Sequence, residues 1–279
     1  MMTKNIRRED MSRAVIVHAI LMTYTLVALY PIFLVIINAF KTRKGIFRDP
    51  MGLPNAETFS LEGFTKVLAK SNFEVFFFNS FSVTIITIAV VLLLGAMAAW
   101  ALSEYKFPGS TWLALYLAIG IMVPIRLGSV SILNLIVDLG LINTLTALVL
   151  VYVAQGLPLA IFILTEFMHQ IPKDLKEAAR CDGVGEFKIF FAIILPLIRP
   201  AVATVAVFTM IPIWNDLWFP LILAPGDGKQ TITLGIQQFI GQYVTDWNAV
   251  LASLSLAIIL LYLIFSRQLI RGLTSGAVK

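Results

Sequence analysis

The chain has 279 residues, of which 59% are hydrophobic and only 13% are charged, and its mean hydropathy is +0.89. A water-soluble core of this size does not need so many apolar residues, so the composition excludes an ordinary soluble domain and indicates a polytopic membrane protein. The formal net charge is +5, but lysine and arginine gather at the ends of apolar segments rather than on a basic face interleaved with aromatic residues. This distribution is a topology signal and argues against nucleic-acid binding.

The first apolar run, residues 14–40, follows a basic segment, residues 1–13, in the order that secretory signal peptides also use. The run is too long for the apolar region of a signal peptide, and residues 38–41 offer no convincing small-residue cleavage site. We therefore predict an uncleaved first span with a cytoplasmic N-terminus. Residues 41–74 have mixed charge, and we expect them to form an outward-facing loop with a short helix near residues 61–69.

Five further apolar runs follow, each close to or above the roughly 20 residues that cross a bilayer. The predicted spans are residues 75–102, 112–137, 144–165, 197–224 and 249–265. Together with the first run they predict an all-α polytopic membrane protein with six transmembrane helices. No internal repeat is evident, so we expect one transmembrane domain over residues 1–279, with both termini in the cytoplasm.

The orientation rests partly on the positive-inside rule, because basic residues are more frequent in the segments that this topology places inside. Lys41, Arg43 and Lys44 run against the rule, since they stand at an outer membrane edge. The rule alone therefore supports the topology only in part.

A charged segment, residues 171–196, separates the fourth and fifth spans and has the character of a cytoplasmic docking element. Pro172 stands where the first turn of a helix accepts a proline, Glu177 follows near the positive helix end, and Gly183 can take the left-handed conformation that ends a helix. We expect a short helix of about three turns here. After the glycine we expect a second amphipathic helix, ended by Pro196.

The predicted docking helix offers small and apolar side chains to a partner surface. Ala178 and Ala179 are small enough for close approach, and Leu175 and Cys181 supply apolar contacts. Cys181 is the single cysteine of the chain, which excludes an intrachain disulfide and a cysteine-based metal cluster.

The same segment carries a recognisable motif. Glu177-Ala178-Ala179, followed by Asp182-Gly183 and then by Ile193 and Leu195-Pro196, resembles the EAA loop of the permease subunits of bacterial ABC importers. The variant EAARCDG followed by ILPLIRPA is most similar to the smaller permease of maltose-type carbohydrate importers. Residues 213–216 and 272–279 resemble the WN(D/E) step and the usual ending of that family. The alternative to a docking loop is an interfacial amphipathic helix without a partner.

The resemblance implies a coupling role, in which the short helix sits in a groove of an ATP-binding subunit. The residues that it assigns to this coupling are Glu177, Ala178, Ala179, Asp182 and Gly183. It further implies a second permease subunit, two ATP-binding subunits, an extracytoplasmic substrate-binding protein and a carbohydrate substrate, assembled in the bacterial cytoplasmic (inner) membrane.

The sequence offers no nucleotide site of its own. Residues 226–231 approach a phosphate-binding loop, but Leu223 stands where its first glycine belongs and Gln230 where Ser or Thr belongs. We therefore expect this chain to bind no cofactor, with ATP and Mg on the partner subunit. No Ser-His-Asp set, metal-spaced cluster or paired intramembrane carboxylates is evident, so we expect a non-catalytic permease subunit.

Three expected helix breaks indicate the substrate path, because freed backbone groups in a membrane need protein or water partners. They lie at residues 124–131, 155–158 and 212–220. A sugar needs hydrogen-bond partners and an aromatic face, and these segments supply both. The path residues predicted on this ground are Arg126, Ser129, Gln155, Trp214, Asn215 and Asp216. The alternative is that these prolines and glycines are ordinary features of membrane helices and that the tryptophans form an interfacial belt.

Family resemblance adds two qualifications to the path. In maltose-type importers the intramembrane sugar contacts belong mainly to the larger permease, which implies that this subunit lines the path without gripping the sugar. Arg126 is not expected at its position in that family, so the charge of the carried sugar stays open.

Arg126 and Asp216 are predicted to pair. At 1.5 Å per residue Arg126 lies about 21 Å and Asp216 about 25 Å above the inner surface, and opposite charges in such a setting pair or face water. The alternative is that both reach the headgroup region and are solvated separately. Gln155 lies roughly 16 Å deep by the same measure, where an amide should face protein or a water-filled path.

Three other classes of function remain to be separated from an ABC permease. A secondary, ion-coupled transporter would need no ATPase, a membrane scaffold would make the docking segment coincidental, and an embedded enzyme would need catalytic residues that the sequence does not offer.

Overall fold

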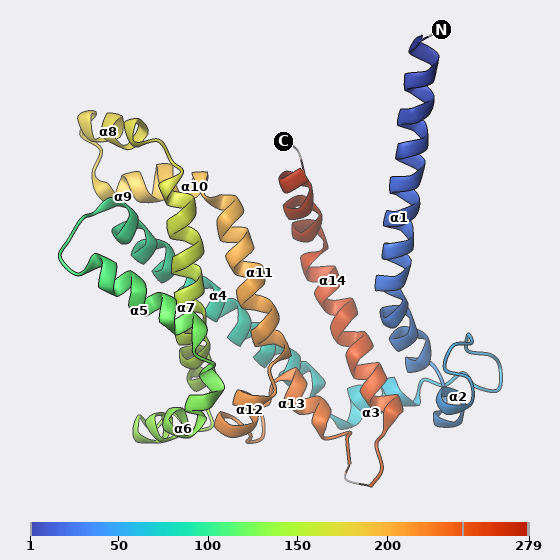
Figure 1. The fold of residues 1–279 in the computed structure, drawn as a ribbon. Helices are drawn as coiled ribbons and strands as arrows, with labels where there is room; N and C mark the ends of the chain where they lie inside the picture. The colour runs from blue at the N-terminus through green and yellow to red at the C-terminus, as the bar shows by residue number, and fades with distance from the viewer. Residues whose placement is uncertain (1, 242, 278–279) are drawn as a thin grey trace. The chain divides into compact units, whose positions relative to one another are not determined.

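The computed structural model describes the backbone of residues 2–241 and 243–277, and the side chains of residues 13–69, 71–241 and 243–263. The described chain is helical and contains no β-strand, only two isolated bridges (Figure 1). The all-α fold predicted from the sequence is confirmed.

The chain divides into two compact units, residues 1–72 with 238–263 and residues 73–237 with 264–279. The prediction of one transmembrane domain over residues 1–279 stays a prediction. The candidate site lies in the second unit, so the first is described briefly.

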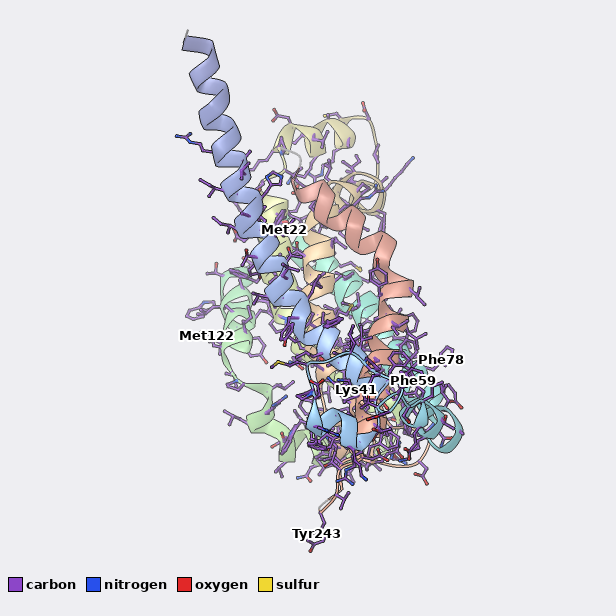
Figure 2. All side chains as sticks on the ribbon, turned by 90° about the vertical axis from the view of Figure 1, so that its right-hand side faces the viewer. Met22, Lys41, Phe59, Phe78, Met122 and Tyr243 are labelled. Atoms are coloured by element: carbon purple, nitrogen blue, oxygen red, sulfur yellow. The ribbon has the colours of Figure 1, made fainter. Side chains whose placement is uncertain are left out.

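In its described residues the first unit contains four helices and the loops between them. They are α1 (Met2–Ala39), α2 (Arg43–Arg48), α3 (Glu62–Lys70) and the first part of α14 (Trp247–Ala277). The side chains of residues 13–32 on α1 are exposed, and Met22 projects from the helix (Figure 2). Such a long uncovered apolar helix is suited to lipid or to another membrane subunit.

Two contacts fix α3 and the loop after α1 within this unit. A Cβ on Gly63 of α3 would lie 2.3 Å from the carbonyl oxygen of Asn248, so only glycine lets α3 approach α14 this closely. Lys41 is buried, and its Nζ donates to the carbonyl oxygen of Asp49 at 2.7 Å, which closes the loop around α2.

The second unit is built around the parallel pair of its two longest helices, α4 (Phe73–Glu104) and α7 (Leu145–His169). The other elements, in chain order, are α5 (Ser110–Met122), η1 (Ile125–Gly128), α6 (Ser129–Asp138), α8 (Lys173–Cys181), α9 (Glu186–Ile189), η2 (Phe190–Ile194), α10 (Leu195–Leu197), α11 (Arg199–Asn215), α12 (Trp218–Leu223) and α13 (Ile232–Gln237).

Small residues let α4 and α7 pack closely. Gly95 faces Ala160, where an added Cβ would come within 3.1 Å of the alanine Cβ, and Gly156 packs against Val91 at the same separation. Close approach through small residues is the usual way in which membrane helices associate.

Two apolar clusters lie along this helix pair. One contains Trp100 and Leu164 together with residues of α8 to α11, and the other contains Val83 and Leu148 together with residues of α6 and α12. Accordingly, α8 and α9 lie at one end of the unit, and α6 and α12 lie at the opposite end (Figure 1).

Among the described residues, three helices are long and apolar enough to cross a membrane, in the ranges Arg13–Ala39, Phe73–Glu104 and Leu145–His169. The number rises to five if each of two bent helix pairs counts as one span. The predicted sixth span coincides with a shorter apolar helix, Trp247–Leu263. Several apolar helices are therefore present as predicted, but the exact count of six is not reached by length and composition alone.

Two of the three predicted helix breaks are confirmed. In the third predicted span the chain bends by 88° between α5 and the helix that starts at Ile125. In the fifth, α11 ends at Asn215 and α12 begins at Trp218, with Asp216 extended between them.

The break predicted at residues 155–158 is wrong, because α7 continues through Pro158 from Leu145 to His169. A proline removes one backbone hydrogen bond, but the rest of the ladder and the packing on both sides hold the helix. Gly156, two residues before Pro158, lies against Val91 of α4 and Thr209 of α11.

The helix that was predicted to end at Pro196 ends one residue later. The helix runs through Pro196 to Leu197, and the chain turns by 76° only before Arg199. A π-helical turn, Phe190–Ile194, precedes the proline, and the N–H of Leu195 bonds the carbonyl of Phe190. This wider turn relieves the clash that a proline causes inside a regular α-helix.

Candidate functional site

The predicted docking helix is present as α8, nine residues long. Pro172 precedes it as the N-cap residue rather than standing inside its first turn. Gly183 has a φ of +74°, and the N–H of Val184 bonds the carbonyl of Ala179 at 3.0 Å, which closes the helix end. The left-handed glycine predicted at this position is confirmed.

Four of the five predicted coupling residues lie on the open side of α8 and its C-terminal turn: Glu177, Ala178, Asp182 and Gly183 are exposed. Ala179 differs, because it is only 8% exposed and belongs to the buried cluster around Trp100. The expectation that both alanines face a partner is therefore wrong for Ala179. The apolar side chains of Leu175 and Cys181 are exposed, as predicted.

The inner side of α8 is held by charged groups. Glu104, the last residue of α4, accepts from Lys176 Nζ through Oε2 at 2.5 Å and from Arg180 Nη2 through Oε1 at 2.7 Å. Lys176 Nζ also lies 5.5 Å from the ring centroid of Trp100, a favourable cation–π placement. The side chains of Glu104 and Lys176 are 11% and 7% exposed, so this pair is largely removed from water.

The network continues to α9. Arg180 donates through Nε to Glu186 Oε1 at 2.7 Å and through Nη2 to Oε2 at 3.2 Å, and the hydroxyl of Tyr105 donates to Glu186 Oε2 at 2.7 Å. Hydrogen bonds to Glu186 and Glu104 raise the pKa of Arg180. Burial and the hydrogen bond to Glu186 raise the pKa of Tyr105, so the hydroxyl stays protonated as a donor.

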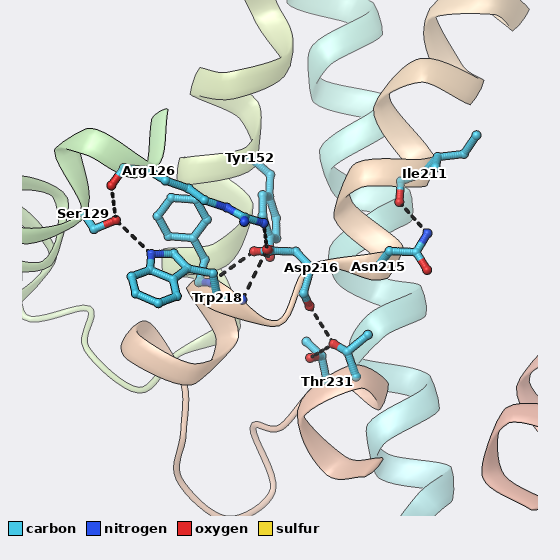
Figure 3. A network of polar contacts seen from close by, with 10 residues as sticks. Arg126, Ser129, Tyr152, Ile211, Asn215, Asp216, Trp218 and Thr231 are labelled. Carbon is cyan, nitrogen blue, oxygen red and sulfur yellow. Dashed lines mark hydrogen bonds and ion pairs between the residues drawn. The ribbon is translucent and has the colours of Figure 1, made fainter. Parts of the chain in front are cut away.

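At the other end of the unit, a polar junction forms around the carboxylate of Asp216, which is 7% exposed (Figure 3). Arg126 Nη2 donates to Oδ1 at 3.2 Å, and the hydroxyl of Tyr152 donates to Oδ2 at 2.8 Å. The backbone N–H groups of Trp218 and Phe219, in the first turn of α12, donate to the same carboxylate at 3.2 and 3.1 Å. The ion pair predicted between Arg126 and Asp216 is present.

Further hydrogen bonds extend this junction. The indole Nε1 of Trp218 donates to Ser129 Oγ at 2.8 Å, and that hydroxyl donates to the carbonyl of Arg126 at 2.6 Å. The hydroxyl of Thr233 donates to the carbonyl of Asp216 at 2.6 Å. The junction thus ties together the breaks in the third and fifth predicted spans, and α7 and α13 with them (Figure 3).

The remaining predicted path residues lie outside the junction. Gln155 is exposed on α7, and Asn215 is exposed with its amide donating to the carbonyl of Ile211 at 2.9 Å. Trp214 is half-buried and packs edge-on against Phe77, with ring centroids 5.7 Å apart. The structure therefore brings together Arg126, Ser129 and Asp216, but not the other three.

The sequence alone does not single out several residues of these sites. Tyr152 is one of several tyrosines in apolar segments, and nothing in the sequence distinguishes it from the others. Only the fold brings its hydroxyl to the carboxylate of Asp216. Lys176 and Arg180 carry a weak signal, since residues four apart share one helix face, and Glu104 is a lone carboxylate at the end of an apolar run. In the described part of the chain, no three His, Cys, Asp or Glu side chains gather in a way that could hold a metal ion.

Comparison with known proteins supports this architecture. The chain is 30% identical over 275 residues to the diacetylchitobiose uptake system permease protein NgcG of Streptomyces coelicolor, covering 97% of this chain and 90% of the relative. It is 31% identical over 254 residues to the probable starch degradation products transport system permease protein AmyC of Thermoanaerobacterium thermosulfurigenes, covering 89% and 91%.

Among solved structures, the fold is similar to a chain of a bacterial ABC transporter involved in the import of the acidic polysaccharide alginate. The TM-score is 0.74 at 19% identity, over 93% of this chain and 97% of that chain. The family of binding-protein-dependent transport system inner membrane components matches residues 91–275, which include the docking helix and the polar junction. The chain therefore belongs to the family of inner membrane components of binding-protein-dependent transport systems.

Proposed function

We propose that the chain is the permease subunit of an ATP-driven carbohydrate importer, which forms the translocation path with a second permease and docks on ATP-binding subunits through α8. One observation carries this proposal. The helix α8 is fixed to its own chain by its inner face, while Glu177, Ala178 and Asp182 stand free on the outer side. A helix held in this way can receive a partner and pass on its movement.

Carbohydrate is the proposed substrate class for two reasons. The relatives are named for the uptake of diacetylchitobiose and of starch degradation products. The polar junction also has the chemistry that a sugar requires, because the partly exposed guanidinium of Arg126 can donate to hydroxyl groups and the exposed part of Trp218 offers an aromatic face.

The path is proposed to pass the junction and the polar and aromatic side chains near it. Ser129, Trp214 and Asn215 complete this lining around Arg126 and Asp216, while Gln155 contributes from α7. Since the buried carboxylate is engaged by four donors, its role is to hold the wall in place, and Arg126 is the group that meets the substrate.

The proposal also includes the orientation of the subunit in the membrane and the proteins with which it works. Both termini lie in the cytoplasm, the polar junction lies toward the outer side of the bacterial inner membrane, and an extracytoplasmic binding protein delivers the sugar. ATP and Mg bind to the ATP-binding subunits, and this chain binds no cofactor and hydrolyses no nucleotide.

Purification of the tagged chain from its native membrane tests the proposal. We expect an ATP-binding subunit and a second permease to co-purify, with ATP hydrolysis that rises when substrate-loaded binding protein is added. Glu177→Ala should reduce this stimulation, and Glu166→Gln, an exposed carboxylate on α7, should not. Uptake by the chain alone, driven by an ion gradient without an ATPase, would establish a secondary transporter instead.

A further inference from the structure

The attachment of α8 to its own chain is mostly polar. Its buried side chains are those of Ala179, a single methyl group, and Lys176, whose charge cannot be buried without a partner. So small an apolar contact does not hold a nine-residue helix in one orientation, because burial stabilises in proportion to apolar area. The charged network must therefore supply most of the free energy that holds α8 in its orientation.

Glu104 is the centre of that network. Its two carboxylate oxygens serve different donors, Oε2 for Lys176 and Oε1 for Arg180, and these donors stand four residues apart on one face of α8. Two bonds to one rigid carboxylate fix both the position and the rotation of the helix. Charge-assisted bonds of this kind are short and strong.

The other end of the attachment is the long helix α4, which ends at Glu104. Trp100 lies one turn earlier, under the ammonium group of Lys176, and Tyr105 directly follows and bonds Glu186 at the start of α9. A movement of α8 is thus passed through charged bonds to the end of α4, whose opposite half contributes Val83 to the cluster next to the polar junction.

From this geometry we infer that Glu104 is a positioning residue, which transmits the movement of α8 to α4 through Lys176 and Arg180 and so couples ATP hydrolysis to transport. The inference rests on the proposed function. Glu104 touches neither nucleotide nor sugar, and it acts by holding α8 on the end of α4.

The first experiment uses the chain alone in lipid nanodiscs and follows backbone amide exchange. Glu104→Gln keeps the side-chain shape but leaves the buried Lys176 ammonium without a compensating charge. We expect the amides of α8 to exchange at least about tenfold faster, because a hydrogen bond to a charged group contributes more than that factor, while the amides of α11 are unchanged. The matched control Glu166→Gln should leave both helices unchanged. Exchange in α8 equal to that of the wild type overturns the inference.

The second experiment uses the assembled transporter, purified through the tagged chain, and measures sugar transported per ATP hydrolysed. Glu104→Gln should lower this ratio at least about tenfold without loss of the ATP-binding subunit, and Glu104→Asp, which keeps the charge, should restore part of it. Lys176→Gln should lower the ratio as well, and the double variant should be no worse than Glu104→Gln alone, because the ion pair between Glu104 and Lys176 is already lost in that variant.

These outcomes separate the inference from the proposed function. If no ATPase accompanies the wild-type chain, the proposed function fails and the inference fails with it. If the transporter assembles and hydrolyses ATP, but Glu104→Gln transports as much sugar per ATP as Glu166→Gln, the inference alone is overturned.

Discussion

Replacing Asp216 with alanine removes the carboxylate that accepts four hydrogen bonds. The four donors differ in burial, so the free-energy cost of losing this acceptor can be estimated for each of them separately. The hydroxyl of Tyr152, buried in the apolar cluster, would lose its partner at a cost of about 1–3 kcal/mol. The N–H groups of Trp218 and Phe219 would lose a side-chain cap, which costs about 1 kcal/mol. The guanidinium of Arg126 can return to water, since 67% of its side chain is exposed, so its pair adds at most about 1 kcal/mol.

Together these losses destabilise the second unit by about 2–5 kcal/mol, which corresponds to a fall in its unfolding temperature of roughly 4–20 °C for a unit of this size. The measurement is thermal unfolding of the purified chain in nanodiscs, followed by tryptophan fluorescence. Asn215→Ala is the matched control, because its exposed amide bonds only its own helix, and it should change stability by less than about 0.5 kcal/mol. If Asp216→Ala unfolds within about 1 °C of that control, the carboxylate does not organise the junction.

Three further predictions concern the docking helix and the first unit. Gly183→Val should cost about 1 kcal/mol or more, because φ is +74° there, and should reduce stimulation of ATP hydrolysis while the chain still inserts into the membrane; full stimulation would contradict the coupling role. Cys181, exposed and single, should react readily with a maleimide in the isolated chain and at least about tenfold more slowly in the assembled transporter, and equal rates would place α8 away from any interface. Gly63→Ala should loosen α3 from α14, since the added Cβ would meet a backbone oxygen at 2.3 Å; amide exchange in α3 that stays at the wild-type rate would refute the close packing.

The sequence was sufficient to predict features that depend on local chemistry. Apolar runs predict membrane helices because lipid leaves few alternatives, and the left-handed turn at Gly183 follows from the one residue type that adopts it freely. The prediction that Arg126 and Asp216 pair required only a count of residues along two helices, since opposite charges at one depth favour each other.

Features that depend on packing between distant segments could not be predicted in the same way. A proline and a glycine together suggested a break near Pro158, but the neighbours of Gly156 on α4 and α11 keep α7 continuous. The same holds for Ala179, whose burial depends on how α8 lies on the unit rather than on its own sequence. Tyr152 belongs to the junction only because α7 passes beside Asp216.

The two ends of the second unit are joined by helices that are suited to transmit movement. At 1.5 Å per residue, the 32 residues of α4 extend about 48 Å, from Phe73 to Glu104, which bonds α8. Gly95 and Ala160 bring α4 into close contact with α7. Close-packed helices slide or rotate as rigid bodies rather than deform, so α4 and α7 move together. α7 in turn carries Tyr152 at the polar junction and Met168 in the cluster next to α8. A displacement of α8 therefore cannot be absorbed locally. It must move the pair of long helices against their neighbours. The broken elements around Asp216 are held by side-chain hydrogen bonds rather than by continuous helix, so they are where such a movement would open or close the proposed path.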